Sequence, residues 1–171
     1  ANVVCMGDKE LFHSRSKELG YSLEINSFSN INDINEKVGF LEIIKCHDIS
    51  SGILNSTNSE YVIENLDFAI DTCIKKMGFG LVSGPISKEN IIEGGYSFSG
   101  HTERIMQKTN SDNVLMLLAS ERLKVALATT HMPISKVSES ITKELIFNKV
   151  KILNQELKEK FNIENPKICL L

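Results

Sequence analysis

The chain has 171 residues, of which 42% are apolar and 24% charged, typical of one globular domain or a large part of a two-domain protein. Its formal charge of -3 excludes the strongly basic surface of nucleic-acid-binding proteins, so no nucleic-acid partner is expected. No apolar run approaches the ~20 residues that span a bilayer, and no signal-peptide pattern opens the chain. We therefore expect a cytoplasmic protein without a membrane partner.

In the first half of the chain, short apolar runs predict strands and amphipathic spacing predicts helices. The expected order is a strand at 2–6, a helix at 9–18, a strand at 21–25, a connection over 26–58 that contains a further strand, and a helix over 57–77. Asp8 is expected to cap the first helix and Gly20 to end it. Thr57 and Glu60 form a capping box for the second helix, which Gly78 is expected to end.

The second half continues the alternation of strands and helices. The expected order is a strand at 79–83, a helical turn from Ser87 to the glycine pair 94–95, a helix at 102–108, strands at 113–118 and 125–130, a helix beginning at Thr142, and a strand at 167–171. Unbroken apolar runs are typical of parallel strands that are covered on both faces. The pattern predicts a layered α/β fold over 1–171 without an internal boundary. Because the chain starts without Met and stops inside an apolar run, we expect a fragment.

Polar residues with catalytic or binding chemistry follow two of the expected strands. His131 comes at the end of the 125–130 run, where α/β sheets place ligands, and is a candidate metal ligand or proton carrier. A ring that is satisfied by a neighbouring carbonyl is the alternative. Thr102 stands beside His101 at a helix start that suits an anion such as phosphate, although Thr102 could simply cap its helix. Lys88 is close enough to the Gly-Pro turn to reach a phosphate or carboxylate, or it is a solvated surface lysine.

These residues do not amount to a complete metal or cofactor site. A catalytic zinc normally takes three protein ligands, and His101 and His131 are too far apart in sequence to form a local ligand pair. The four cysteines form no C-x-x-C pair and are expected to be reduced thiols. No G-x-G-x-x-G follows a strand, so no NAD-binding residues are expected within this chain.

Four ordered motifs resemble the 4-hydroxythreonine-4-phosphate dehydrogenase family of vitamin B6 biosynthesis. They are the stretches 54–62, 82–88, 98–103 and 125–133, and the similarity runs from about Gly52 to Leu171. The resemblance implies the fold type of isocitrate and isopropylmalate dehydrogenases, in which two α/β domains flank a cleft and two identical subunits share the active site. Only part of such a two-domain subunit is present. The family's opening Gly-Asp-Pro-x-Gly-Ile-Gly segment is absent before Ala1.

The resemblance also implies a reaction and roles for individual residues. The family oxidises 4-phosphooxy-L-threonine with NAD and a divalent metal (Zn, Mg or Co), and the product loses CO₂ to give 3-amino-2-oxopropyl phosphate. His101 and Thr102 match the substrate-binding positions, and His131 matches a metal ligand. Lys88 matches a lysine of the family to which no firm role is transferred. The other metal ligands and most of the NAD site lie beyond Leu171, so the 171-residue chain alone is expected to be inactive.

Two other functions are compatible with the same residues. The first is a related dehydrogenase that acts on threonate or erythronate 4-phosphate, since the contacts that recognise the amine are not distinguishable in this sequence. The second is a fragment without catalytic activity that acts as a dimerisation module.

Overall fold

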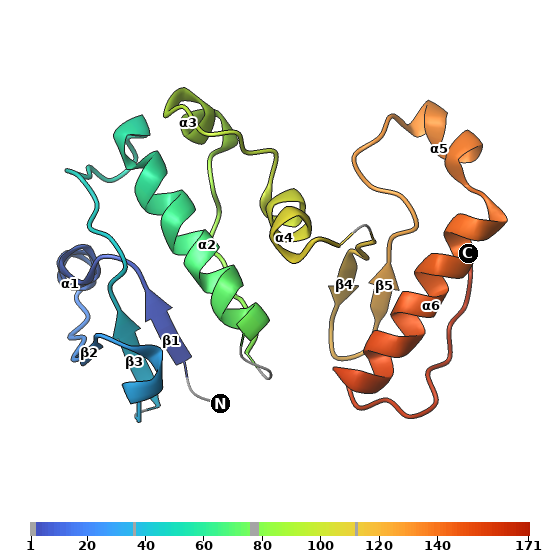
Figure 1. Ribbon diagram of the computed structural model, residues 1–171, viewed down its shortest axis with the longest axis horizontal. Helices are drawn as coiled ribbons and strands as arrows, with labels where there is room; N and C mark the ends of the chain where they lie inside the picture. Colours follow the sequence, from blue (N-terminus) through green and yellow to red (C-terminus); the bar gives the residue numbers. More distant parts are fainter. Residues whose placement is uncertain (1–2, 36, 76–78, 112) are drawn as a thin grey trace. The chain divides into compact units, whose positions relative to one another are not determined.

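The computed structural model describes residues 3–35, 37–75, 79–111 and 113–171 (Figure 1). Its chain forms two compact units, Ala1–Ser111 and Asp112–Leu171, which are described separately below. Both units combine helices with strands, as expected for an α/β protein.

A parallel three-stranded sheet opens the first unit. Its strands, in spatial order, are β1 (Val3–Met6), β3 (Val38–Leu41) and β2 (Ser27–Phe28). Leu41 pairs with Met6 on one side and with Phe28 on the other. The helix α1 (Lys9–Glu18) follows β1 and provides the crossover that parallel strands require. Parallel strands therefore occur in this sheet, whereas the sequence indicated them for the apolar runs of the second half of the chain.

Local capping sets the limits of α1 as the sequence predicts. The Asp8 carboxylate accepts hydrogen bonds from the backbone N–H groups of Glu10 and Leu11, at 2.8 and 3.2 Å. Gly20 follows the helix with a φ of +76°, a left-handed conformation that glycine adopts without strain. Asp8 also accepts from the backbone N–H of Cys46, so the same carboxylate ties this helix to a distant loop.

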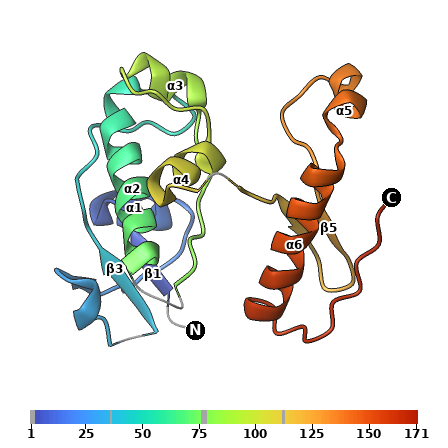
Figure 2. The same ribbon diagram turned by 45° about the vertical axis from the view of Figure 1, so that its right-hand side comes forward.

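The core of the first unit lies among its helices. These are the 3₁₀ turns η1 (Ile31–Asp33) and η2 (Ser56–Asn58), α2 (Ser59–Lys75), α3 (Lys88–Glu93) and α4 (His101–Thr109). Buried apolar side chains of α2 (Ile63, Leu66, Ile70) and α3 (Ile91) form one cluster with Phe98, which lies between α3 and α4. α3 packs on η2, and α4 packs on α2 (Figure 2). This cluster therefore joins the helix α2 to the two segments that carry the candidate site residues.

The second unit is a hairpin beside a long helix. It contains β4 (Leu117–Ala119), β5 (Lys124–Ala126), α5 (Ile134–Ser140) and α6 (Lys143–Glu159). The hydroxyl of Thr142 accepts from the N–H of Leu145 and caps α6, as expected. Both ribbon views place α6 alongside the hairpin (Figures 1 and 2). Lys149 of this helix also donates to the carbonyl of Val114, which precedes β4.

Several expected strands are wrong. Residues 21–25, 79–83 and 167–171 lack regular structure. β4 covers only the end of the expected strand at 113–118, and β5 only the start of the 125–130 run. Most side chains in these stretches are exposed, 68% for Tyr21 and 95% for Val82, so no continuous packed face orders the backbone. β4 and β5 pair antiparallel because the tight turn at Ser120–Leu123 joins them directly, whereas parallel strands need a long crossover.

Two details of the helices also differ from expectation. Asn55 rather than Thr57 caps the segment leading into α2, because its side-chain oxygen accepts from the backbone N–H and the hydroxyl of Thr57. The helix α5 lies in a polar stretch without an amphipathic pattern and was not expected. The proposed end of α2 at Gly78 lies outside the described residues.

Candidate active site

The start of α4 brings together residues from two separate motifs. A side-chain carbon added at Gly100 would lie 3.4 Å from Nζ of Lys88 and 2.6 Å from Oε2 of Glu103. The absence of a side chain at Gly100 therefore lets the Lys88 ammonium approach the backbone at the helix start. We call the group of Lys88, Gly100, His101, Thr102 and Glu103 the α4 corner. Its members come from the Gly-Pro turn motif and the Gly-His-Thr-Glu motif of the sequence.

His101 carries an unsatisfied nitrogen in this corner. Its Nε2 atom is buried and has no hydrogen-bond partner among the residues that the structure describes. Its ring packs edge-on against Phe98, with ring centroids 5.9 Å apart and planes at 79°. A buried polar atom without a partner is costly, so a site of this kind favours a polar ligand that supplies the missing hydrogen bond.

The alternative interpretation, in which Thr102 caps its own helix, is wrong. Gly100 occupies the N-cap position of α4, which therefore has no side-chain cap, and Thr102 is the second helical residue. The first backbone hydrogen bond of the helix runs from the N–H of Arg104 to the carbonyl of Gly100. An uncapped helix start presents N–H groups and a positive dipole end, which suits a phosphate or carboxylate.

A set of ion pairs between α2 and α4 was not predicted from the sequence. Arg104 forms a two-pronged contact with Asp67, with Nε at 2.7 Å from Oδ1 and the terminal nitrogen at 2.6 Å from Oδ2. Lys108 lies 2.9 Å from Asp71 and 3.6 Å from Asp67. We call these four residues the α2–α4 ion ladder. The i,i+4 spacing of both the acidic and the basic pair was the signal available in the sequence.

The charge of Asp67 depends on this arrangement. Burial alone raises the pKa of a carboxyl group, but the hydrogen bonds and charge of Arg104 outweigh it, together with Lys108. The net result is a pKa of Asp67 below its ordinary value. The acid is therefore ionised near neutral pH, and the guanidinium of Arg104 stays paired with it.

His131 lies in the second unit, in the loop between β5 and α5. The residue is exposed and has a φ of +57°, a left-handed conformation that costs a non-glycine residue of order 1–3 kcal/mol. No hydrogen bond of its ring occurs within residues 113–171, so the alternative of a ring satisfied by a neighbouring carbonyl is not supported. An exposed imidazole held in an unusual backbone conformation is a suitable single ligand for a metal ion.

The described part of the chain does not assemble a metal site by itself. Its His, Cys, Asp and Glu side chains form no group of three that could hold a metal ion. A divalent metal therefore does not fit these residues without further ligands.

Membrane-spanning helices are a separate question. None of the helices in the described residues has the length and apolar character needed to span a lipid bilayer.

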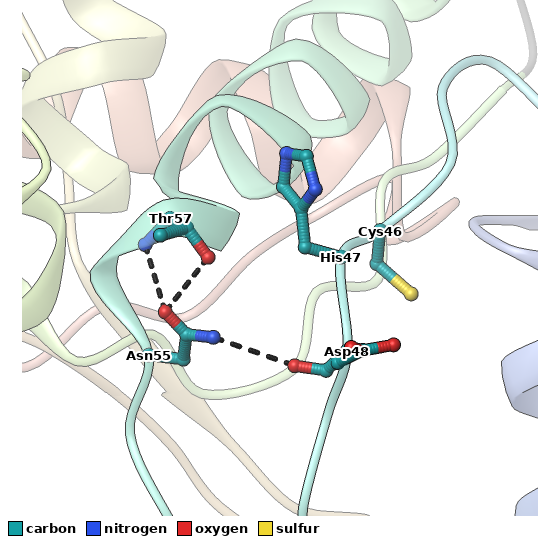
Figure 3. A pocket seen from close by; sticks show the side chains of 5 residues that line it. All are labelled: Cys46, His47, Asp48, Asn55 and Thr57. Atoms are coloured by element: carbon teal, nitrogen blue, oxygen red, sulfur yellow. Dashed lines mark hydrogen bonds between the residues drawn. The ribbon is translucent and has the colours of Figure 1, made fainter.

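A pocket that the sequence did not predict lies in the first unit. It measures about 540 Å³ and is lined by Cys46, His47, Asp48, Asn55 and Thr57 (Figure 3). Asn55 links two of its walls, because its side chain accepts from Thr57 and donates to the carbonyl of Asp48. Its walls include the 54–62 motif, and adjacent Cys, His and Asp residues at 46–48 were the signal available in the sequence.

Nucleophilic chemistry by the thiol in this pocket is not favoured. Burial and the hydrogen bond to the Asp8 carboxylate raise the pKa of Cys46 to about 11. The reactive form of a cysteine is the thiolate, which is scarce at neutral pH for such a group. The backbone N–H of His47 is used by the side chain of Asn58 at 2.7 Å. The pocket is thus a polar junction between loops.

Comparison with known proteins gives a consistent family over the full chain. Residues 1–171 match the family model for the pyridoxal phosphate biosynthetic protein PdxA. A 4-hydroxythreonine-4-phosphate dehydrogenase of Pseudoalteromonas translucida (strain TAC 125) is 35% identical over 174 residues, covering 99% of this chain and 53% of that relative. One from Saccharophagus degradans (strain 2-40) is 36% identical over 171 residues, covering 98% and 51%. The chain spans about half the length of the curated relatives it matches.

Solved structures agree on the fold. The crystal structure of a 4-hydroxythreonine-4-phosphate dehydrogenase from Burkholderia phymatum aligns with a TM-score of 0.78 at 23% identity, over 95% of this chain and 50% of that one. The enzyme of the same name from Klebsiella pneumoniae aligns with a TM-score of 0.80 at 17% identity, over 91% and 49%. At these identities the likeness concerns the fold alone, and it confirms the α/β fold expected from the sequence.

Proposed function

The chain belongs to the PdxA family of pyridoxal phosphate biosynthetic proteins, and we propose that the whole protein is a 4-hydroxythreonine-4-phosphate dehydrogenase. The proposed reaction oxidises the hydroxyl of 4-phosphooxy-L-threonine with NAD as the hydride acceptor. Loss of CO₂ from the resulting keto acid then gives 3-amino-2-oxopropyl phosphate. The observation that carries the proposal is the α4 corner, where a family motif forms an uncapped helix start beside an unpaired imidazole nitrogen.

In this proposal the α4 corner binds the substrate. The free N–H groups and the hydroxyl of Thr102 receive an anionic group, while Nε2 of His101 gains the hydrogen bond that it lacks. Lys88 adds a positive charge beside Gly100 and forms no ion pair within the described residues. The helix start and the positive charge of Lys88 favour a phosphorylated substrate over an uncharged one.

His131 is proposed as one ligand of a divalent metal, with Zn, Mg or Co as the candidates. Because this chain holds no group of three ligands in its described residues, the remaining ligands are proposed to come from outside it. The NAD site is likewise proposed to lie outside these residues. We further propose a homodimer whose subunits share the active site, on the basis of the family resemblance.

Steady-state assays of the whole protein test this function. NADH formation is measured with 4-phosphooxy-L-threonine, threonate 4-phosphate and erythronate 4-phosphate in parallel, with and without added Zn, Mg or Co. We expect the first substrate to give the highest kcat/KM and the activity to need a metal. A preference for either of the other two phosphates would instead identify a related dehydrogenase.

The 171-residue chain alone provides the matching control. It is expected to show no NAD reduction with any of the three substrates, since a complete metal site is not present in its described part. Robust NAD reduction by this chain would contradict the proposed division of the active site. Absence of activity in the whole protein, together with dimer formation by the chain alone, would favour a dimerisation module.

A further inference from the structure

The attachment of α4 to the rest of its unit relies on charge. None of the nine residues of this helix, His101–Thr109, is buried. Several of its side chains are half-buried, but no fully buried apolar residue of α4 anchors this helix on α2, although the helix starts at the proposed substrate-binding residues. The contacts that fix the relation of the two helices are the ion pairs of the α2–α4 ion ladder.

The geometry of the ladder limits both the tilt and the axial position of α4. Asp67 and Asp71 lie one turn apart on α2, and their partners Arg104 and Lys108 lie one turn apart on α4. Two contacts separated along each helix axis resist rotation of one helix against the other. A shift of α4 by one turn would leave Arg104 beside Asp71 and break the two-pronged contact with Asp67. The ladder therefore specifies one register.

The Arg104–Asp67 contact is the stronger of the two. A guanidinium that meets both oxygens of a carboxylate is fixed in orientation as well as distance, which a lysine contact is not. The side chains of Arg104 and Asp67 are only 22% and 20% exposed, so salt screens them less than a surface pair. This contact also lies close to the site, since Arg104 is two residues from Thr102 and its N–H closes the first turn at Gly100.

We propose that Asp67 and Arg104 are positioning residues that hold the start of α4 in the orientation required for the phosphorylated substrate. They act through His101 and Thr102 and do not contact the substrate themselves. The inference rests on the proposed function of the α4 corner, and it assigns to Asp67 of α2 the role of fixing the orientation of α4.

Kinetics of the whole protein test the proposal. Asp67→Asn and Arg104→Gln each remove one charge of the pair while keeping a side chain of similar size. We expect the KM for 4-phosphooxy-L-threonine to rise about tenfold, because loss of a hydrogen bond between charged groups lowers the fraction of molecules with a correctly placed α4 by about that factor. The KM for NAD should stay unchanged. The conservative Arg104→Lys variant retains the charge but loses the two-pronged contact. Its substrate KM should therefore lie between those of the wild type and Arg104→Gln.

A charge exchange and a matched control separate positioning from general stability. The double variant Asp67→Arg with Arg104→Asp should recover part of the lost substrate affinity, because it restores an ion pair across the helices. Glu18→Gln breaks an exposed ion pair with Arg15 in α1 and should leave both KM values unchanged. An unchanged substrate KM in Asp67→Asn, or equal rises in both KM values, would overturn the proposal.

Hydrogen exchange distinguishes failure of this inference from failure of the proposed function. If the whole wild-type protein forms no NADH with any of the three phosphates, the proposed function is wrong, whatever the ladder does. The ladder is then judged by the backbone amides of residues 101–109, which should exchange faster in Asp67→Asn than in wild type, while those of α1 should not. Equal exchange of the α4 amides in the two proteins would overturn the positioning role independently of activity.

Discussion

Phe98 gives the sharpest test of how the core supports the candidate site. Its side chain is 5% exposed within the cluster that joins α2 and α3, and its ring packs edge-on against His101. Replacement of this ring should therefore weaken the core and release the imidazole at the same time. Two variants, Phe98→Ala and Phe98→Leu, separate the two effects.

The expected magnitudes follow from burial and from the ring contact. Phe98→Ala leaves a cavity among buried aliphatic side chains and should lower the free energy of unfolding by about 3–5 kcal/mol. Phe98→Leu keeps most of the apolar volume and should cost about 1 kcal/mol for the change of shape. Loss of the edge-on ring contact adds roughly 0.5–1.5 kcal/mol. Phe98→Leu should thus destabilise the unit by about 2 kcal/mol in total.

Stability and substrate affinity are measured on the same whole protein. Hydrogen exchange of the amides of α2 and α3 reports local stability, and steady-state kinetics report the KM for 4-phosphooxy-L-threonine. Ile91→Val is the matched control, since Ile91 is 1% exposed in the same cluster and should cost about 0.5–1.5 kcal/mol. We expect Phe98→Leu, but not Ile91→Val, to raise the KM. Equal KM values for the two variants would refute the argument that the ring positions His101.

Three further predictions concern other parts of the first unit and the exposed chain end. Gly94→Ala should lower the free energy of unfolding by about 1–3 kcal/mol, because the new methyl group would collide with the start of α2. The control Gly80→Ala places its methyl group in open space and should change the free energy of unfolding by less than about 0.5 kcal/mol. Thermal melts of the two variants with equal midpoints would contradict this crowding at Gly94. Burial and a neighbouring carboxylate raise the pKa of Cys46 to about 11, so iodoacetamide at mildly alkaline pH should label the exposed Cys169 before Cys46. Equal labelling rates of the two thiols in peptide mass spectrometry would contradict the buried, carboxylate-bonded environment of Cys46. Burial raises the pKa of Asp67, but the guanidinium of Arg104 outweighs burial, so the folded-state pKa is lowered. The stabilisation from ionised Asp67 is therefore present above its unfolded-state pKa of about 3.9 and is lost as pH falls through the lower folded-state pKa. Stability measured against pH should therefore fall less steeply at acidic pH in Asp67→Asn, and an unaltered acid limb would argue against the pairing.

The features that the sequence predicted correctly depend on neighbouring residues. The Asp8 and Thr142 caps are local hydrogen bonds between a side chain and N–H groups of the next turn, so residue type and spacing suffice to find them. The start of α3 at Ser87 is of the same kind. The strand β1 is likewise found where the apolar run at 2–6 indicated it.

The failures have a common physical cause, which is that strand formation needs a partner that the local pattern does not specify. Alternation at 21–25 describes a possible face, but β3 takes its hydrogen bonds from the chain immediately after that stretch, with the N–H of Phe40 donating to Asn26. The 79–83 run is apolar, yet it pairs with no strand in the described part of the chain. Apolar content alone therefore overestimates the extent of strands.

The candidate site was predictable as a set of motifs but not as an arrangement. Residue types indicated His101, Thr102, Lys88 and His131. The approach of Lys88 to Gly100 depends on how α3 and the segment that leads into α4 pack on one core, which no local pattern encodes. The α2–α4 ion ladder was missed for the same reason. Its i,i+4 spacings are visible in the sequence, but which helix faces which is a tertiary property.

The central claim is that the α4 corner binds the phosphorylated substrate of an NAD-dependent dehydrogenase. It is tested most directly by NADH formation in the whole protein carrying His101→Ala, with 4-phosphooxy-L-threonine varied at saturating NAD. We expect the KM for this substrate to rise at least about tenfold, since a buried hydrogen-bonding group that meets a charged ligand contributes about that factor or more. A His101→Ala enzyme whose KM and kcat equal those of the wild type would contradict the claim.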